Sequence, residues 1–169
     1  IKSVLGEEID MESLGGARVH CETTGNAHFF AESEEECFAQ IKKLLSYLPA
    51  HNAEKPAPVK ASQPLKKYKI EKVVPVDPTT PYDVRNVIRA LTDDSEFIEI
   101  QEMWAQNIVI GYGRMEGRTV GFVANQPMYL AGVLDCDSSD KAARFIRYCD
   151  AFEIPIVTLE DMPGYLPGV

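Results

Sequence analysis

The segment PGYLPG, at 163–168, offers backbone chemistry rather than side-chain chemistry. It follows the apolar run IPIVTLE, which is typical of a buried strand. Ligands of α/β sheets bind beyond the carboxyl ends of strands, and glycine lets a backbone N–H group approach a ligand closely. The N–H groups of Gly164 and Gly168 could therefore stabilise an enolate or another oxyanion. The alternative, which spacing alone favours, is a Pro-Gly turn that only redirects the chain.

A second long loop, ANQPMYLAGVLD at 124–135, leaves another β-rich run, and the same two interpretations apply to it. The sequence contains no GxSxG motif, no Walker loop and no HExxH motif, so no side-chain nucleophile, phosphate loop or metalloprotease site is indicated. We therefore expect no catalytic side chain. Structural or exposed positions explain the three histidines better than catalysis does: His20, His28 and His51.

Five carboxylates cluster in the second half of the sequence. Asp135, Asp137 and Asp140 precede or begin a predicted helix, and N-terminal capping is the better account of them. Glu160 and Asp161 end a predicted strand, where an acid or base role is open but has no further support. These residues alone do not define a site.

The elements that must position these loops are predicted in the region 80–169. Thr80 is expected to cap a helix with Pro81 in its first turn, and Glu116-Gly117 is a hairpin signal. The expected elements are a helix at PYDVRNVIRAL, strands at EFIEIQ, NIVIGYGRM and RTVGFVAN, a helix at DSSDKAARFIRYCDAFE with its apolar face at Ala142, Phe145, Ile146, Cys149 and Phe152, and a strand at IPIVTLE. This alternation predicts an α/β unit of about three strands with one face left exposed.

The first 50 residues form a separate block. We expect loops and short turns in SLGGARVHCETTGNAHFFAES and a helix in SEEECFAQIKKLLSYLP, where Ser33 and Glu36 have capping-box spacing. Its apolar stripe is predicted at Phe38, Ile41, Leu44, Leu45 and Leu48. The proline-rich stretch 51–79 is interpreted as a linker, because so long a connection inside one compact domain would be unusual.

Composition excludes several classes of function. A net charge of -9 and a pI near 4.8 argue against nucleic acid, and the basic cluster KKYK is interpreted as a solvated linker face. No apolar run approaches the roughly 20 residues of a membrane helix, and no secretory signal opens the chain. The four cysteines contain no CxxC pair, so we expect neither a metal site nor a disulfide framework, with Cys37 and Cys149 as core residues. Cytoplasmic localisation is expected, or the mitochondrial matrix in a eukaryote.

The sequence resembles a known family along most of its length. The stretch from GRTVGFVANQPMYLAGVLDCDSSDKAARF to EDMPGYLPGV is similar to carboxyltransferase subunits of biotin-dependent acyl-CoA carboxylases. So are LGGARVHCETTGNAHFFAESEEECF, KKLLSYLP and PYDVRNVIRAL, in the same order. Within this family the propionyl-CoA carboxylase β chain and the methylmalonyl-CoA decarboxylase α chain are the nearest groups.

The resemblance implies an α/β fold of the crotonase type (ClpP/crotonase). Residues 1–50 then correspond to the tail of the N-terminal, acyl-CoA-binding domain, 51–79 to a linker, and 80–169 to the first part of the C-terminal, biotin-binding domain. The two glycine-rich oxyanion segments of the family are expected to lie outside the chain, which would then carry partial sites. The implied chemistry is proton removal from the acyl thioester and capture of CO2, with backbone groups stabilising the enolate.

The resemblance also implies a biotin and acyl pocket. It is expected at Gly164, Tyr165, Leu166, Asn125, Gln126, Ala131 and Gly132. Tyr165 would be an aromatic wall of this pocket. Tyr82, Asp83 and Arg85 match a family motif, although a hydrogen-bonded network at a helix start explains them equally well. No metal ligand is implied.

The implied cofactor is biotin, as carboxybiotin on a carrier domain, and the implied substrate is a coenzyme A thioester. The implied partners are a biotin carboxyl carrier protein or biotin carboxylase subunit and further copies of the chain, usually in a hexamer. Two alternatives stay open. The chain could belong to a sodium-pumping methylmalonyl-CoA or glutaconyl-CoA decarboxylase, or it could by itself be an inactive assembly or biotin-docking module.

Overall fold

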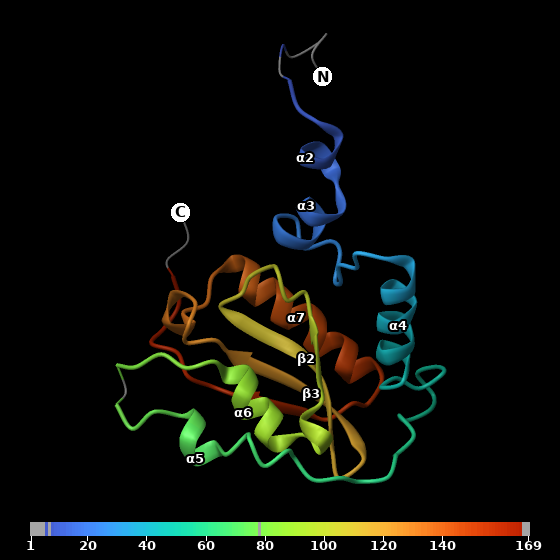
Figure 1. Cartoon of the computed structure of the whole chain (residues 1–169), viewed down its shortest axis with the longest axis vertical. Helices are drawn as coiled ribbons and strands as arrows, with labels where there is room; N and C mark the ends of the chain where they lie inside the picture. Colours follow the sequence, from blue (N-terminus) through green and yellow to red (C-terminus); the bar gives the residue numbers. More distant parts are fainter. Residues whose placement is uncertain (1–5, 7, 78, 167–169) are drawn as a thin grey trace.

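The structure is a computed structural model that describes residue 6 and residues 8–77 and 79–166 of the chain. Its centre is a mixed four-stranded sheet with the strand order β1-β2-β3-β4 (Figure 1). The strands are β1 (Phe97–Ile100), β2 (Ile108–Met115), β3 (Arg118–Asn125) and β4 (Ile156–Leu159). The first three pair antiparallel, and β4 pairs parallel with β3. The strands lie at the four segments where the sequence predicts them, and all four join one sheet, which was expected to hold about three.

The β2–β3 hairpin turns at Glu116 and Gly117, as predicted. Both residues have positive φ angles, 51° and 78°, which a tight two-residue hairpin requires. The Asp93 carboxylate accepts hydrogen bonds from both backbone N–H groups, at 3.2 and 2.7 Å. A Cβ atom on Gly117 would lie 2.0 Å from the carbonyl oxygen of Val59, so this position needs glycine.

Both faces of the sheet are covered by helices (Figure 1). On one face α7 (Cys136–Ala151) packs Phe145 and Cys149 against β2, and on the other α6 (Val84–Leu91) packs Val84 and Ile88 against β2 and β3. The expectation of an exposed face is therefore wrong, because α6 precedes the sheet in sequence and covers it. The alternation of side chains along β2 serves both cores: Ile108, Ile110 and Tyr112 face α7, and Val109 faces α6.

The buried stripe of α7 differs from the predicted one. Ile146 is exposed, whereas Ser138 and Lys141 are fully buried. The Lys141 Nζ atom lies 2.7–3.2 Å from four backbone carbonyl oxygens in the turn after β1 and at the first residue of β2, and its three N–H groups donate hydrogen bonds among them. Burial lowers the pKa of Lys141 to about 8. A lysine is thus part of the core because the turn supplies polar partners for its charge.

Two predicted details of helix ends are wrong. Thr80 does not cap α6 and Pro81 does not lie in its first turn. The helix instead begins at Val84, after Asp83, whose carboxylate accepts a hydrogen bond from the Arg85 backbone.

The N-terminal block holds two short helices, α2 (Met11–Gly15) and α3 (Ala17–Glu22), where turns were expected.

Helix α4 (Glu34–Leu45) begins after Ser33, which accepts a hydrogen bond from the Glu36 backbone as predicted. The Glu36 side chain accepts from the Glu32 backbone instead of from Ser33, so the capping box is not completed. Cys37 is exposed, contrary to the prediction. The predicted apolar stripe is only partly covered. Its exposed members are Phe38, Ile41 and Leu45.

The described part of the predicted linker, residues 51–77 and 79, runs along the second block rather than free of it. It contains α5 (Ile70–Val73). Two hydrogen bonds attach it to the second block: the Val59 N–H donates to the Gly117 carbonyl at 2.9 Å, and the Leu65 N–H donates to Ser95 Oγ at 2.8 Å.

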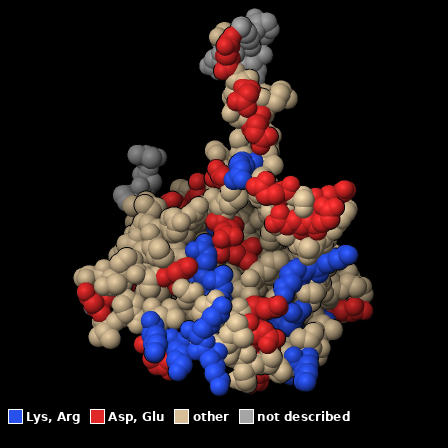
Figure 2. Space-filling view, viewed as in Figure 1, with Lys and Arg blue, Asp and Glu red and all other residues tan. Residues whose placement is uncertain are grey.

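On the face shown in Figure 2, acidic side chains line the N-terminal segment, whereas lysines and arginines gather at the opposite end. The division of the chain near residues 50 and 80 stays a prediction.

Candidate functional site

A groove of about 680 Å³ lies beyond the carboxyl ends of β3 and β4. This is the edge at which α/β sheets bind ligands. Three chain segments form it: the stretch before α6, the loop after β3 and the loop after β4. The lining residues are 74–77, 79–82, Pro127, Ala131 and 161–163.

The loops after β3 and β4 pair with each other. Leu134 and Tyr165 form a parallel β-bridge, in which the Leu134 N–H donates to the Gly164 carbonyl at 3.3 Å and the Leu166 N–H donates to the Leu134 carbonyl at 2.8 Å. The Leu134 side chain packs against the core cluster under α7. We call residues 130–134 and 161–166 together the double loop, since these contacts join them into one unit.

Asp161 anchors the second half of the double loop. Its carboxylate accepts a hydrogen bond from the Tyr82 hydroxyl at 2.8 Å, and its N–H donates to the Asn125 side chain at 3.4 Å. A Cβ atom on Gly132 would lie 2.5 Å from the Asp161 carbonyl oxygen, so only glycine permits this approach. Burial, followed by the bond to Asp161, raises the pKa of Tyr82 to about 12. Tyr82 is therefore a protonated donor at neutral pH.

The first half of the double loop contains a left-handed turn. Leu130, Ala131 and Gly132 have successive φ angles of 49°, 51° and 74°. Non-glycine residues in this conformation cost on the order of 1–2 kcal/mol each, and such strain collects at functional sites. The Asn125 side chain donates to the Gly132 carbonyl at 2.9 Å and holds the turn in place.

Gln126 ties the same loop to the start of α6. Its side-chain N–H donates to Asp83 at 2.7 Å, and its carbonyl oxygen accepts from the Val84 backbone at 3.3 Å. Arg85, which follows Val84 in α6, makes a two-pronged ion pair with Glu99, with N–O distances of 2.5 and 2.8 Å. The network at the helix start that the sequence suggested for Asp83 and Arg85 is present.

The seven predicted pocket residues occupy three kinds of position: in the groove wall, buried behind it, and exposed after it. Ala131 lines the groove, and Gly132 lies directly behind it against Asp161. Asn125 and Gln126 are buried, and their amides bond to the protein itself. The remaining three, Gly164, Tyr165 and Leu166, follow the groove residue Pro163, and the two side chains among them are exposed. Gly168 lies outside the described residues.

Sequence reasoning missed part of the groove wall. Residues 74–77 and Thr79 were assigned to a linker, yet they line the groove together with residues 80–82. Tyr82 was noted only as part of a family motif that a hydrogen-bonded network at a helix start explains equally well. A usable signal existed, because an aromatic residue with a hydroxyl directly precedes a helix that must pack near the strand ends.

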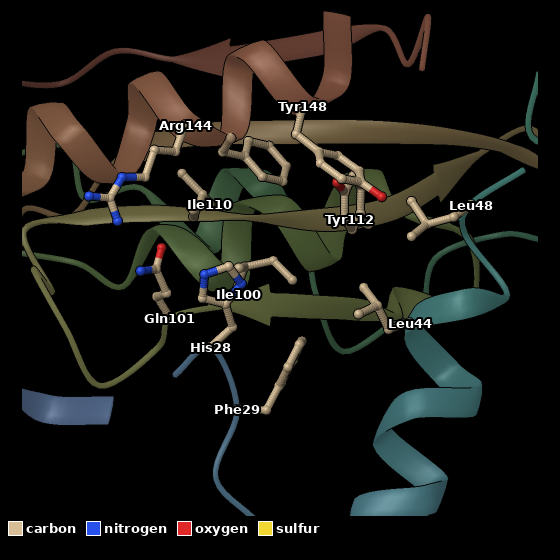
Figure 3. Close-up of a pocket in the computed structure, with 11 residues that line it drawn as sticks. His28, Phe29, Leu44, Leu48, Ile100, Gln101, Ile110, Tyr112, Arg144 and Tyr148 are labelled. Carbon is tan, nitrogen blue, oxygen red and sulfur yellow. The ribbon is translucent and has the colours of Figure 1, made fainter. Parts of the chain in front are cut away.

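A second cavity, of about 280 Å³, lies between the N-terminal block and the sheet and shares no lining residue with the groove. In Figure 3 Arg144 and Gln101 lie on one side of it, and Leu44 and Leu48 lie on the other. His28 also lines it. Burial, and then the nearby Arg144 charge, lower the pKa of His28. Residues of both blocks line this cavity, and most of their side chains are apolar.

The groove has the means to bind and orient a ligand. Of the lining residues that the structure describes, none is a lysine, arginine, histidine or cysteine, and the polar side chains are hydroxyls and two carboxylates, those of Asp77 and Asp161. Among the described residues there is no cluster of three or more histidine, cysteine or acidic side chains that could hold a metal ion. In the same residues, no helix is long and apolar enough to cross a membrane. Hydrogen bonding and backbone groups are therefore the chemistry that this groove offers.

Comparison with known proteins gives a consistent result. A putative propionyl-CoA carboxylase beta chain of Bacillus subtilis is 53% identical over 171 residues, covering 100% of this chain and 33% of the relative. The methylmalonyl-CoA decarboxylase subunit alpha of Veillonella parvula is 46% identical, covering 99% of this chain and 33% of the relative. The chain thus spans about a third of the length of the curated relatives it matches.

A solved structure shows the same architecture. The structure of transcarboxylase 12S, with methylmalonyl-coenzyme A and methylmalonic acid bound, superposes with a TM-score of 0.92 at 44% identity. The match covers 100% of this chain and 33% of that one, and it confirms the predicted crotonase-like α/β fold. The carboxyl transferase domain family matches residues 1–169. The chain belongs to the carboxyl transferase family.

Proposed function

We propose that the protein moves a carboxyl group between carboxybiotin and a short-chain acyl-CoA of the propionyl-CoA or methylmalonyl-CoA type. One observation carries this proposal: the family match extends over the whole chain, and relatives named as propionyl-CoA carboxylase beta chains align with it from end to end. The proposal concerns the full-length polypeptide, of which these residues would form one part of the site.

The chemistry of the groove supports the ureido ring of biotin as its ligand. That ring is neutral and carries N–H donors and a carbonyl acceptor. The described lining of the groove has no cationic side chain. It offers the Tyr82 ring and the carboxylates of Asp77 and Asp161, which can accept hydrogen bonds from the ring N–H groups. The hydroxyls of Thr79 and Thr80 donate to Asp77 and can still accept.

When bound, carboxybiotin would supply the carboxyl group. The residues of this chain would bind the ring, orient it through the double loop and exclude water, with backbone N–H groups such as that of Gly164 facing developing negative charge.

Further partners complete the proposed function. The acyl-CoA would lie opposite the groove, and a biotin carboxyl carrier protein or biotin carboxylase subunit would deliver the biotin. A hexamer of this chain is proposed as well, since the transcarboxylase 12S match is described as a hexamer assembly. The predicted pocket residues keep their assignment as a proposal, with Ala131 and Gly164–Leu166 facing ligand and Asn125, Gln126 and Gly132 supporting them.

A second candidate is the carboxyltransferase subunit of a decarboxylase, and the relative from Veillonella parvula favours it. Both candidates use the same groove and the same transfer step. They differ in the fate of the carboxyl group, which a decarboxylase releases as CO2 through a membrane partner. The two can be separated only with the full set of subunits.

The test uses the full-length polypeptide, methylmalonyl-CoA and free biotin. Transfer of the carboxyl group to biotin converts methylmalonyl-CoA to propionyl-CoA, which is followed by chromatography. Biotin-dependent formation of propionyl-CoA supports the proposal. Absence of product with methylmalonyl-CoA, malonyl-CoA and glutaconyl-CoA alike would contradict it. Sodium dependence of turnover with the co-purified subunits would favour the decarboxylase.

A further inference from the structure

We infer that Tyr82 is a positioning residue for carboxyl transfer. Its hydroxyl holds Asp161, and Asp161 fixes the second half of the double loop against the groove. This inference rests on the proposed function, because the double loop is the part of the chain assigned there to biotin. Tyr82 would act through the loop rather than on the reacting atoms.

The hydrogen bonds around the double loop single out Tyr82. The first half of the double loop is held by Asn107, a residue outside the loop, whose side chain donates to the Val133 carbonyl at 2.8 Å. Its second half receives the Tyr82 hydroxyl at Asp161, from a residue 79 positions earlier in the chain. Asn125 contacts both halves, but it ends β3 and leads directly into the same loop. Tyr82 therefore connects residues 161–166 to the α6 side of the groove.

The Tyr82 contact suits a positioning role. A hydroxyl that donates to a carboxylate makes a charge-assisted hydrogen bond, which is shorter and stronger than a neutral one. Both residues also line the groove, so the bond forms part of its wall. A change in this bond would move the wall and the adjoining Gly164–Leu166 segment, and would therefore weaken the binding of biotin in the groove.

The first experiment compares Tyr82→Phe with wild type in the full-length polypeptide. Phenylalanine keeps the ring in the groove wall and removes only the hydroxyl. We expect the kcat/KM for free biotin to fall about tenfold, mainly through KM, with an unchanged KM for methylmalonyl-CoA. Tyr68→Phe is the matched control, because the Tyr68 hydroxyl makes no hydrogen bond within the described residues.

The comparison of the KM for biotin with the KM for methylmalonyl-CoA distinguishes a positioning role from a merely structural one. A merely structural role would lower the amount of active enzyme and reduce kcat for both substrates with their KM values unchanged. That result, or kinetics identical to wild type, would overturn the inference. A selective rise in the KM for biotin supports it.

Two further measurements make the test independent of a single variant. Asp161→Asn keeps an oxygen that can accept the Tyr82 hydrogen bond, so its KM for biotin should lie closer to wild type than that of Asp161→Ala. In addition, Tyr82→Phe should accelerate hydrogen exchange at the Leu166 N–H, which pairs with Leu134. If wild type shows no transfer, the proposed function fails, while unchanged exchange at Leu166 would overturn the positioning role itself.

Discussion

The Nζ atom of Lys141 lies 2.7 Å from the carbonyl oxygen of Trp104, inside a ring of four backbone carbonyls. This contact places a charged group from α7 beneath the turn that connects β1 to β2. The same turn carries Asn107, which bonds to Val133 in the double loop. The buried lysine therefore supports the frame on which the candidate site is built.

Replacement of Lys141 by methionine should destabilise the protein strongly. Methionine fills a similar volume but donates no hydrogen bond, so the surrounding carbonyls lose a charged donor, while those of Gln101 and Ala105 keep a backbone N–H partner. We expect a loss of about 3 kcal/mol in the free energy of unfolding. Thermal melting of the full-length polypeptide at pH 7 measures it, with the exposed Lys42→Met as control. Equal melting temperatures for the two variants would show that water replaces the ammonium without cost.

His28 should make stability depend on pH in the acidic range. Its pKa is lowered in the folded state by burial and by Arg144, so the unfolded chain takes up the proton first as the pH falls. The neutral form of His28 therefore contributes stability that is complete above its unfolded pKa of about 6.5 and is lost below it.

His28→Gln isolates this effect, because glutamine does not titrate and all other groups are shared. Thermal melting of wild type and variant is compared at pH 7.5 and pH 5.0. We expect wild type to lose more stability than the variant between these two values. A difference between the two proteins that stays constant with pH would contradict the assignment.

Gly117→Ala tests the packing of the hairpin against the preceding segment. The added Cβ would lie 2.0 Å from the Val59 carbonyl oxygen, and alanine is disfavoured at a φ of 78°. We expect a loss of about 2 kcal/mol or more in the free energy of unfolding. Gly15→Ala is the control, since its Cβ would meet only His20, at 3.8 Å. Similar stabilities for both variants would mean that residues 51–79 detach readily from the second block.

The sheet could be predicted from local sequence signals. Glu116-Gly117 lies between two β-rich runs, and IPIVTLE contains four branched aliphatic residues. Each of these elements can therefore be predicted from a few neighbouring residues. The short helices α2 and α3 were not predicted, because Gly15 and Gly16 are turn signals, and in the structure they mark the end of α2 and the junction between the two helices.

The candidate site was only partly predictable, and the reason is tertiary. The position of two loops at strand ends follows from the order of elements, and both loops do meet there. Side-chain direction does not follow from order, so the inward turn of Asn125 and Gln126 was not foreseen. Lys141 was missed for the same reason, since hydrophobic periodicity counts lysine as a surface residue. Only the folded turn shows the carbonyls that accept its charge.

Gly164→Val tests whether the loop after β4 approaches a ligand. Gly164 has a φ of 155°, and no atom of the described chain lies within 4 Å of an added Cβ. A larger side chain there would therefore collide with little inside the chain, although valine strains the backbone. If a backbone N–H at this position faces bound biotin, valine would intrude on the ligand, and carboxyl transfer should fall at least about tenfold.

Gly164→Ala adds a single methyl group and should give a smaller loss in the same assay. Propionyl-CoA formation from methylmalonyl-CoA is measured for both variants, with assembly checked by gel filtration. A larger loss of transfer for valine than for alanine, with unchanged assembly, would place the ligand against this glycine, because the fold leaves the space beside it open and both variants carry a Cβ atom at this φ. Full transfer in both variants would mean that PGYLPG is only a turn, and the enolate would then have to be stabilised by other backbone groups.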